Sequence, residues 1–227
     1  MNYEETGYER TYAHIKEDPA IRTYISQADA SLIALGFTEH SFAHVTQVAV
    51  TTGYILETLG YPERLVELAK IAGHLHDIGN LINRVDHSQS GAMMAFRLLE
   101  ERGFPPEEIA LITTAIGNHD EGTGQPVNEL AAALILADKS DVRRSRVRNQ
   151  DTSTFDIHDR VNYSVTKSEL KINDAHTRIR LKLTVDTRYG SVMDYFEIFM
   201  ARMILCRKAA ETLGLQFKLT INDQPLI

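Results

Sequence analysis

The chain has 227 residues, 43% hydrophobic and 24% charged, a composition typical of a soluble globular protein with a substantial core. Its formal charge of −7 argues against general nucleic-acid binding, which requires a basic surface. No apolar run approaches the roughly 20 residues that cross a bilayer, and the acidic first residues do not resemble a secretion signal. Because the single cysteine, Cys206, excludes an internal disulfide, we expect a cytoplasmic protein whose metal ligands would be His, Asp and Glu.

Helical patterns dominate the chain as far as about residue 144. Apolar residues recur at helical spacing, and capping residues and glycines mark several ends. The predicted helices run, in order, from Ile21 to Leu32, Phe42 to Leu59, Pro62 to Ala72, His87 to Gly103, Pro105 to Ile116, and Asn128 to Asp138. The last of these is apolar on all sides, so we expect it to be buried.

The pattern changes after the arginine-rich stretch 143–148. Residues 149–159 are polar and irregular, and we interpret them as a linker between two units. The first unit, residues 1–148, is predicted to be a helical bundle. The second, residues 160–227, is predicted to be small and to contain strands.

Strict alternation of apolar and polar residues over 178–186 predicts a strand, and a weaker strand is predicted to begin at Tyr163. An amphipathic helix over 192–213 and a last strand over 217–221 follow. We therefore expect a mainly α protein, in which a helical bundle precedes a small α+β unit with the order strand, strand, helix, strand. Free edges of that sheet could pair in a homodimer.

The most informative segment is 72–80, where an apolar helix ends in His74, His76 and Asp77. Burying a carboxylate beside an apolar stripe is costly unless the carboxylate is paired or bound to a metal. Six candidate ligands each end or face a predicted apolar helix: His44, His76, Asp77, His87, His119 and Asp138. A single histidine of this kind is more often an ordinary buried residue, but six over five helices favour a metal site.

Imidazole and carboxylate ligands suit divalent Fe, Mn, Zn, Co or Ni, and Mg is not distinguished from these. A carboxylate can bridge two ions, and Asp77, next to a candidate histidine ligand, is the natural bridge. Two ions about 3.5–4 Å apart would clamp the oxygens of a phosphoryl group and generate hydroxide at neutral pH. The sequence therefore predicts two divalent ions, with Asp77 central to catalysis.

These motifs resemble the HD superfamily of metal-dependent phosphohydrolases over roughly residues 30–145. The resemblance rests on an ordered set of short segments: 44–49, His76-Asp77 within 75–79, 86–92, Asn118-His119, and 137–139. It implies that His44, His76, Asp77 and Asp138 hold one metal, and that His87 and His119 hold a second. Dinuclear members often have another histidine after the one matching His119, where this chain has Asp120. That departure leaves open the ligands and identity of the second metal.

Residues 119–126 resemble a shortened form of the stretch that names the HD-GYP cyclic dinucleotide phosphodiesterases. The second histidine and the tyrosine of that stretch are missing. A glycine-rich turn before the Asn128 helix is therefore the preferred interpretation.

Several nearby residues have less certain roles. His74 lies two residues before His76, which places it about 200° away around a helix, in the surroundings of the site or in solvent. His40 lies one turn before His44, but His44 fits the motif better. Lys139 is a candidate for catalysis and for binding substrate phosphate. Arg143 and Arg144 are candidates for recognising an anionic substrate, although a solvated arginine face is equally compatible with their stretch.

The resulting hypothesis is a metal-dependent phosphohydrolase in which a metal-activated hydroxide attacks the phosphorus of a nucleotide or another small phosphoester. No membrane partner is expected. The resemblance leaves one enzymatic alternative, a dinuclear iron oxygenase with a similar ligand set. A nucleotide-binding sensor that uses the same site is the non-enzymatic alternative.

Overall fold

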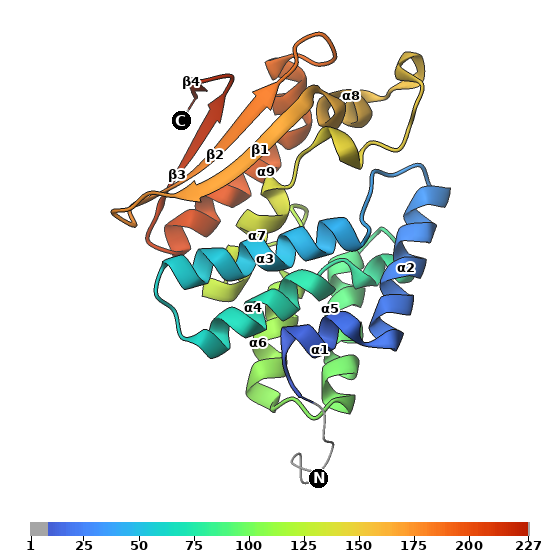
Figure 1. Cartoon of the computed structure of the whole chain (residues 1–227), viewed down its shortest axis with the longest axis vertical. Coiled ribbons are helices and arrows are strands. Elements are labelled where there is room, and N and C mark those ends of the chain that lie inside the picture. Colours follow the sequence, from blue (N-terminus) through green and yellow to red (C-terminus); the bar gives the residue numbers. More distant parts are fainter. Residues whose placement is uncertain (1–8, 227) are drawn as a thin grey trace.

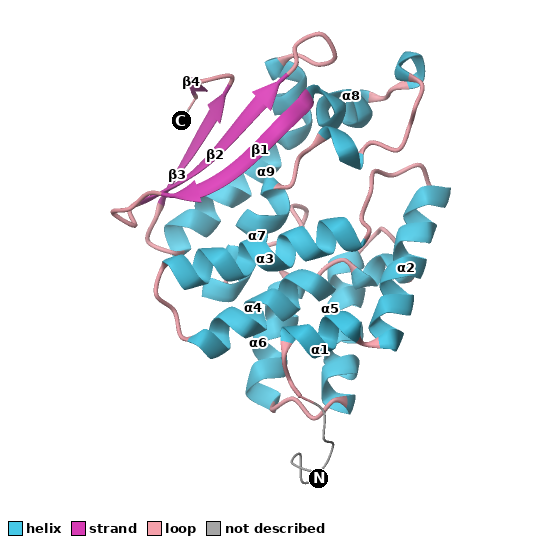
Figure 2. Cartoon of the chain, in the orientation of Figure 1, coloured by secondary structure: helices cyan, strands magenta, loops and turns pink. Residues whose placement is uncertain are grey.

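The computed structural model describes residues 9–226. Helices make up most of the molecule, and a small sheet lies at one end of it (Figure 1, Figure 2). The predicted mainly α architecture with a small C-terminal sheet is confirmed. None of the helices in this part of the chain is both long and apolar enough to cross a membrane.

Seven α-helices and a short 3-10 turn precede residue 141 in the described part of the chain. They are α1 (Tyr12–Glu17), α2 (Pro19–Ala34), α3 (Phe42–Thr58), α4 (Glu63–Leu75), η2 (Ile78–Leu81), α5 (His87–Glu101), α6 (Pro106–Gly117) and α7 (Glu129–Ser140). Asn128 caps α7 as predicted, because its side chain accepts a hydrogen bond from the Ala131 N–H at 2.8 Å. Gly103 follows the end of α5 with a φ of 71°, a left-handed conformation that favours glycine.

The C-terminal part contains the sheet and two α-helices. Its elements are η3 (Arg144–Arg146), η4 (Thr152–Thr154), α8 (Ile157–Ser164), β1 (Val165–Ile172), β2 (Arg178–Val185), α9 (Val192–Thr212), β3 (Gln216–Ile221) and β4 (Gln224–Pro225). The sheet order is β1-β2-β3-β4. Strand β2 runs antiparallel to β1 and parallel to β3, and α9 connects the two parallel strands.

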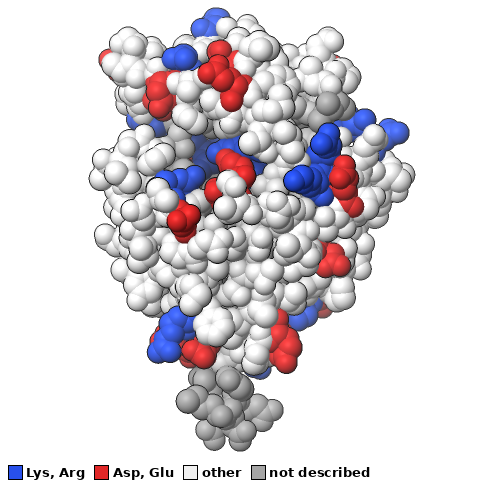
Figure 3. All heavy atoms as spheres, turned by 180° about the vertical axis from the view of Figure 1, so that it is seen from behind, with Lys and Arg blue, Asp and Glu red and all other residues white. Residues whose placement is uncertain are grey.

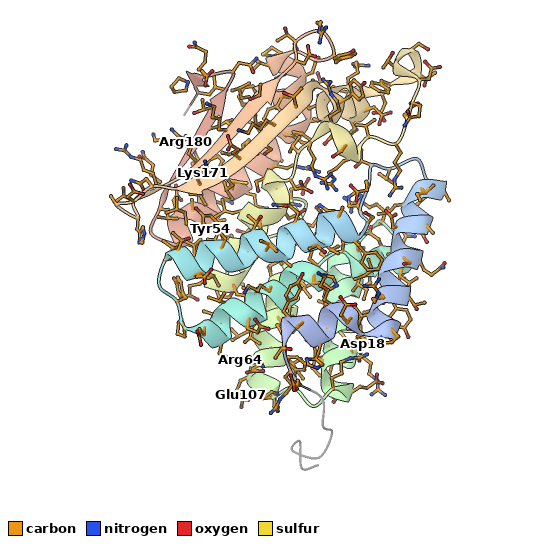
Figure 4. All side chains as sticks on the ribbon, viewed as in Figure 1. Asp18, Tyr54, Arg64, Glu107, Lys171 and Arg180 are labelled. Atoms are coloured by element: carbon orange, nitrogen blue, oxygen red, sulfur yellow. The ribbon has the colours of Figure 1, made fainter. Side chains whose placement is uncertain are left out.

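One face of the sheet is buried and the other is exposed. Ile179, Leu181 and Leu183 of β2 are buried, as the alternation predicted. Lys171 and Arg180 project from the ribbon of the exposed face, and Tyr54 of α3 lies near the sheet (Figure 4). The Ile172 N–H donates a hydrogen bond to the Tyr54 hydroxyl at 3.4 Å. The sheet is therefore attached to the bundle along β1.

The prediction of a strand from Tyr163 is wrong by two residues, because Tyr163 belongs to α8. Asp156 accepts a hydrogen bond from the Asp159 N–H at 2.7 Å and so caps this helix. Ile157 and Val161 then lie one turn apart, and Val161 is buried. Residues 157–159 of the predicted linker are thus helical, and β1 begins at Val165.

Helix α9 packs against both the sheet and the bundle, through contacts with β3, α7 and α8. Figure 1 shows it behind the strands, between the sheet and the yellow-green helix α7. Helix α7 is buried along almost its whole length, as predicted, and Ile135 at its centre is fully buried. The buried apolar residues of both parts form one continuous core. Side chains of α9 can therefore reach the site that α7 helps to form.

Replacing Ile135 with alanine should lower the free energy of unfolding by about 2–5 kcal/mol, because it leaves a cavity in the centre of the core. Urea denaturation followed by circular dichroism measures this change. The matched control is Ile33→Ala on α2, where the side chain is 50% exposed and the expected loss is below about 1 kcal/mol. Equal losses for the two variants would contradict the central position of α7.

Candidate metal centre

Six side chains that the sequence singled out as metal ligands meet at one point inside the bundle. Helices α3, α5 and α7 contain His44, His87 and Asp138, respectively. His76 and Asp77 follow the end of α4, and His119 lies two residues after the end of α6. All four imidazoles are at most 3% exposed, and the Asp77 residue is 5% exposed.

Two glycines allow the helices to approach closely enough for this meeting. A Cβ on Gly73 would lie 2.7 Å from the Ala49 Cα, so glycine lets α4 pack directly on the backbone of α3. A Cβ on Gly79 would lie 2.0 Å from the His87 carbonyl oxygen. The first contact brings His76 toward His44, and the second brings His87 toward Asp77.

The first group of ligand atoms surrounds one oxygen of Asp77. Asp77 Oδ2 lies 3.5 Å from His44 Nε2 and 3.4 Å from His76 Nε2. Asp138 Oδ1 lies 3.5 and 3.6 Å from the same two nitrogens. Ligand atoms bound to one ion at about 2.0–2.2 Å would be separated by roughly 3.0–3.5 Å, so these atoms fit around a single metal ion.

The second group surrounds the other oxygen of Asp77. Asp77 Oδ1 lies 3.4 Å from His87 Nε2 and 4.0 Å from His119 Nε2, and these two nitrogens are 3.2 Å apart. Asp120 Oδ1 lies 4.0 Å from His87 Nε2, where dinuclear relatives were expected to place a histidine. The two oxygens of Asp77 thus face two separate sets of nitrogens, which is the arrangement of a bridging carboxylate.

Hydrogen bonds fix the orientation of every ligand imidazole. The Nδ1 atom of each ring lies near an oxygen that carries no hydrogen, so Nδ1–H is the donor and Nε2 faces the cluster. His76, His87 and His119 donate to the carbonyl oxygens of Gly73, Arg84 and Ile116 at 2.8, 3.1 and 2.6 Å. His44 donates to Asp141 Oδ2 at 2.7 Å. Histidine ligands in metal sites are typically held in this way.

The buried carboxylates of the cluster favour a bound cation. Burial would raise the pKa of Asp77, but the neighbouring His76 and His40 rings lower it well below its ordinary value. Burial would lower the pKa of His76, but the carboxylates of Asp77 and Asp138 raise it to about 10. In the absence of metal, a proton on His76 therefore supplies positive charge that the two carboxylates require. A divalent ion can replace that proton.

A chain of alternating charges leads from Asp138 to α9. Lys139 Nζ lies 2.7 Å from Asp138 Oδ2 and 2.5 Å from Glu121 Oε2. Arg202 Nε donates to Glu121 Oε1 at 2.6 Å. Burial would raise the pKa of Glu121, but Lys139 and Arg202 lower it to about 2, so this carboxylate is ionised. Lys139 thereby pairs with one oxygen of Asp138, while the other, Oδ1, faces the His44 and His76 nitrogens.

The structure places two predicted substrate-binding residues away from the cluster. Arg143 pairs with Asp141 and Glu39, and Arg144 pairs with Asp186. Both line a groove between α3 and β1 rather than the cavity at the cluster. Lys139 does line that cavity, so the structure brings only Lys139 to it. The role in substrate binding stays a prediction for all three residues.

His74 points away from the cluster, as its spacing predicted, but it is not in solvent. It is fully buried, and its ring lies edge-on against Tyr12 with centroids 5.6 Å apart. Burial, followed by the charge of Lys16, lowers its pKa to about 4. His74 is therefore a neutral core residue.

Sequence reasoning set aside His40 and missed two other residues that support the cluster. His40 Nε2 lies 3.9 Å from Asp77 Oδ2, although His40 precedes α3. Asn80 donates a hydrogen bond to Asp77 Oδ1 at 3.0 Å and so fixes this carboxylate. Asp141 orients His44 from 97 residues away. The i, i+3 spacing of Asp77 and Asn80 was a usable local signal, whereas no spacing connects Asp141 with His44.

A cavity of about 220 Å³ opens onto the cluster. Its floor includes Asp77, His87, His119 and Asp138. The C-terminal part supplies another portion of the lining, from α8, from α9 and from Arg146. On the back of the molecule, lysine and arginine atoms are visible in a hollow at about mid-height (Figure 3).

Residues 41–143 match the family model of the HD domain, and this range contains all six clustered side chains. This segment of the chain is an HD domain. The chain is 23% identical over 186 residues to the uncharacterized protein MJ1020 of Methanocaldococcus jannaschii. The alignment covers 72% of this chain and 71% of that protein. It is also similar to a crystal structure described as a predicted HD superfamily hydrolase from an uncultured Thermotogales bacterium. That match has 25% identity and a TM-score of 0.44, and covers 55% of this chain and 67% of the other.

In the HD domain, Asp141→Asn should weaken the binding of a divalent ion by about 10–100-fold, because the amide no longer accepts the His44 Nδ1 hydrogen bond as a carboxylate does. Competition with a metal chelator measures the dissociation constant. Asp174→Asn, at an exposed turn between β1 and β2, is the matched control and should leave it unchanged. Unchanged affinity in both variants would show that Asp141 does not orient a ligand.

Proposed function

We propose that this protein is a metal-dependent phosphohydrolase that acts on a small phosphoester, with a nucleotide as one candidate. The observation that carries the proposal is the position of Asp77, whose two oxygens face two sets of imidazole nitrogens at the floor of a cavity. The resemblance of the motifs to the HD superfamily of phosphohydrolases agrees with this arrangement, and residues 41–143 match the HD domain.

The residues present fit two divalent ions. His44, His76, Asp77 and Asp138 would hold one, and Asp77, His87 and His119 would hold the other. The donor set of nitrogens and carboxylate oxygens suits a transition metal, and the Nδ1 hydrogen bonds already direct each Nε2 inward. Two such ions would polarise the phosphoryl oxygens and lower the pKa of a water molecule.

The protein's own groups contribute orientation and charge. Asn80 and the imidazoles hold Asp77 in one position, and Lys139 fixes the rotation of the Asp138 carboxylate through its ion pair. Because these groups are buried and hydrogen-bonded before substrate arrives, little reorganisation is needed when charge develops during the reaction. Lys139 also lines the cavity, where it offsets the negative charge of Asp138 and Glu121.

Replacing Asp77 with alanine should abolish metal binding and reduce phosphate release by roughly a thousandfold, equivalent to about 4 kcal/mol of transition-state stabilisation. Elemental analysis of the purified protein and a panel of phosphoesters, assayed with and without oxygen, measure the two effects. Asp174→Ala at an exposed turn is the control and should retain both properties.

The same experiment separates the proposal from its alternatives. Iron in the protein, oxygen-dependent turnover and no phosphate release would assign an oxygenase instead. Nucleotide binding by the wild-type protein without turnover, retained in Asp77→Ala, would assign a sensor.

A further inference from the structure

Arg146 is a buried cation at the wall of the cavity. It is 5% exposed, and it lies beyond the segment that matches the HD domain. Its Nε donates to the Glu39 carbonyl oxygen at 2.9 Å, and its Nη1 donates to the Asp141 carbonyl oxygen at 2.8 Å. Nη2 has no hydrogen-bond partner within residues 9–226. Of the arginines in the stretch 143–148, Arg146 is the one that lines the cavity.

Arg202 of α9 lies at the wall of the same cavity. Its Nε donates to Glu121, and its guanidinium carbon lies 4.4 Å from the centroid of the Phe199 ring. These contacts fix the orientation of the Arg202 guanidinium, but only one of its three nitrogens, Nε, donates a hydrogen bond in them. Nη1 and Nη2 have no hydrogen-bond partner in the described part of the chain.

Two guanidinium groups that share a small cavity repel each other unless an anion lies between them. The charge of Arg202 acts against that of Arg146, and both guanidiniums interact with the Asp138 carboxylate. The lining contains as many acidic as basic side chains, with Asp77, Asp138, Asp156 and Asp159 against Arg84, Lys139, Arg146 and Arg202. Two further carboxylates lie next to these cations, Glu121 beside Lys139 and Arg202, and Asp141 beside Arg146. Two bound divalent ions would bring more positive charge than these two carboxylates cancel, and the excess favours a ligand with more than one negative charge.

We propose that Arg146 and Arg202 form an anion-binding pair that holds a dianionic phosphoryl group, which makes a phosphomonoester the substrate class. This inference rests on the proposed function, and it gives α9 of the C-terminal part a direct contact with substrate. A phosphomonoester offers two negative charges on three terminal oxygens, enough to bind metal and both arginines. A phosphodiester offers one charge on two free oxygens. Guanidinium groups suit the monoester because they bind phosphate oxygens through paired N–H donors.

The first test replaces Arg202 with glutamine, whose amide can still donate to Glu121 and so preserve the Lys139–Asp138 pair. In the metal-loaded protein, calorimetry should show that inorganic phosphate binds at least about tenfold more weakly than to the wild type, because a charged hydrogen-bond donor is lost. kcat/KM for p-nitrophenyl phosphate should fall by a similar factor, through KM. For bis-p-nitrophenyl phosphate the fall should be less than about twofold.

The matched control is Arg207→Gln, which removes an exposed arginine from the same helix and should change none of these values. Equal losses for the monoester and the diester, or unchanged phosphate affinity in Arg202→Gln, would overturn the inference. If the wild type hydrolyses neither ester but binds phosphate through Arg202, the proposed function fails while the anion pair stands. If hydrolysis is normal in Arg202→Gln, the function stands and the pair fails.

A second test addresses Arg146 without replacing it, because Arg146 also holds two backbone carbonyls. A crystal structure of the metal-loaded protein with tungstate should place the anion within hydrogen-bond distance of Nη2 of Arg146 and of Arg202. Tungstate bound at the metals with neither arginine in contact would overturn the proposal.

Discussion

The carboxylate of Asp77 must stay ionised inside the protein, and much of the molecule is arranged to meet that requirement. An unpaired buried carboxylate costs several kcal/mol, so its surroundings have to supply positive charge and hydrogen-bond donors. The Asp77 carboxylate lies among the four imidazoles of the cluster and accepts a hydrogen bond from Asn80. The close packing at Gly73 and Gly79 follows from the same need, because any side chain there would hold the helices apart.

The C-terminal part takes part in this arrangement without supplying any of the six clustered side chains. Helix α9 lies against α7, and Arg202 continues the chain of charges that starts at Asp138. Displacing α9 would leave Glu121 with one cation instead of two and would weaken the restraint on Lys139. The small sheet therefore acts on the site through the helix that connects two of its strands.

Local patterns predicted most of the fold and the core of the site. The six clustered side chains each lie within or next to an apolar helix, so helical periodicity marked them as candidates, and the resemblance to the HD superfamily selected His44 over His40. Helix α8 was missed because its eight residues contain few apolar positions, although Asp156 is a residue type that favours a helix N-cap. Arg146 and Arg202 could not be selected from the other arginines. Whether an arginine faces a cavity depends on how η3 and α9 pack, and this information is not local.

Three of the four clustered histidines share one local device. His76, His87 and His119 each donate Nδ1–H to the carbonyl oxygen three residues earlier. For His76 and His119 these are carbonyls of a final helical turn, where carbonyl oxygens have fewer intrahelical partners. The rings are thus fixed by the backbone rather than by the ion they would hold. A site that offers fixed imidazole nitrogens would favour an ion that binds nitrogen at about 2.0–2.2 Å over calcium, which prefers oxygen at about 2.3–2.6 Å.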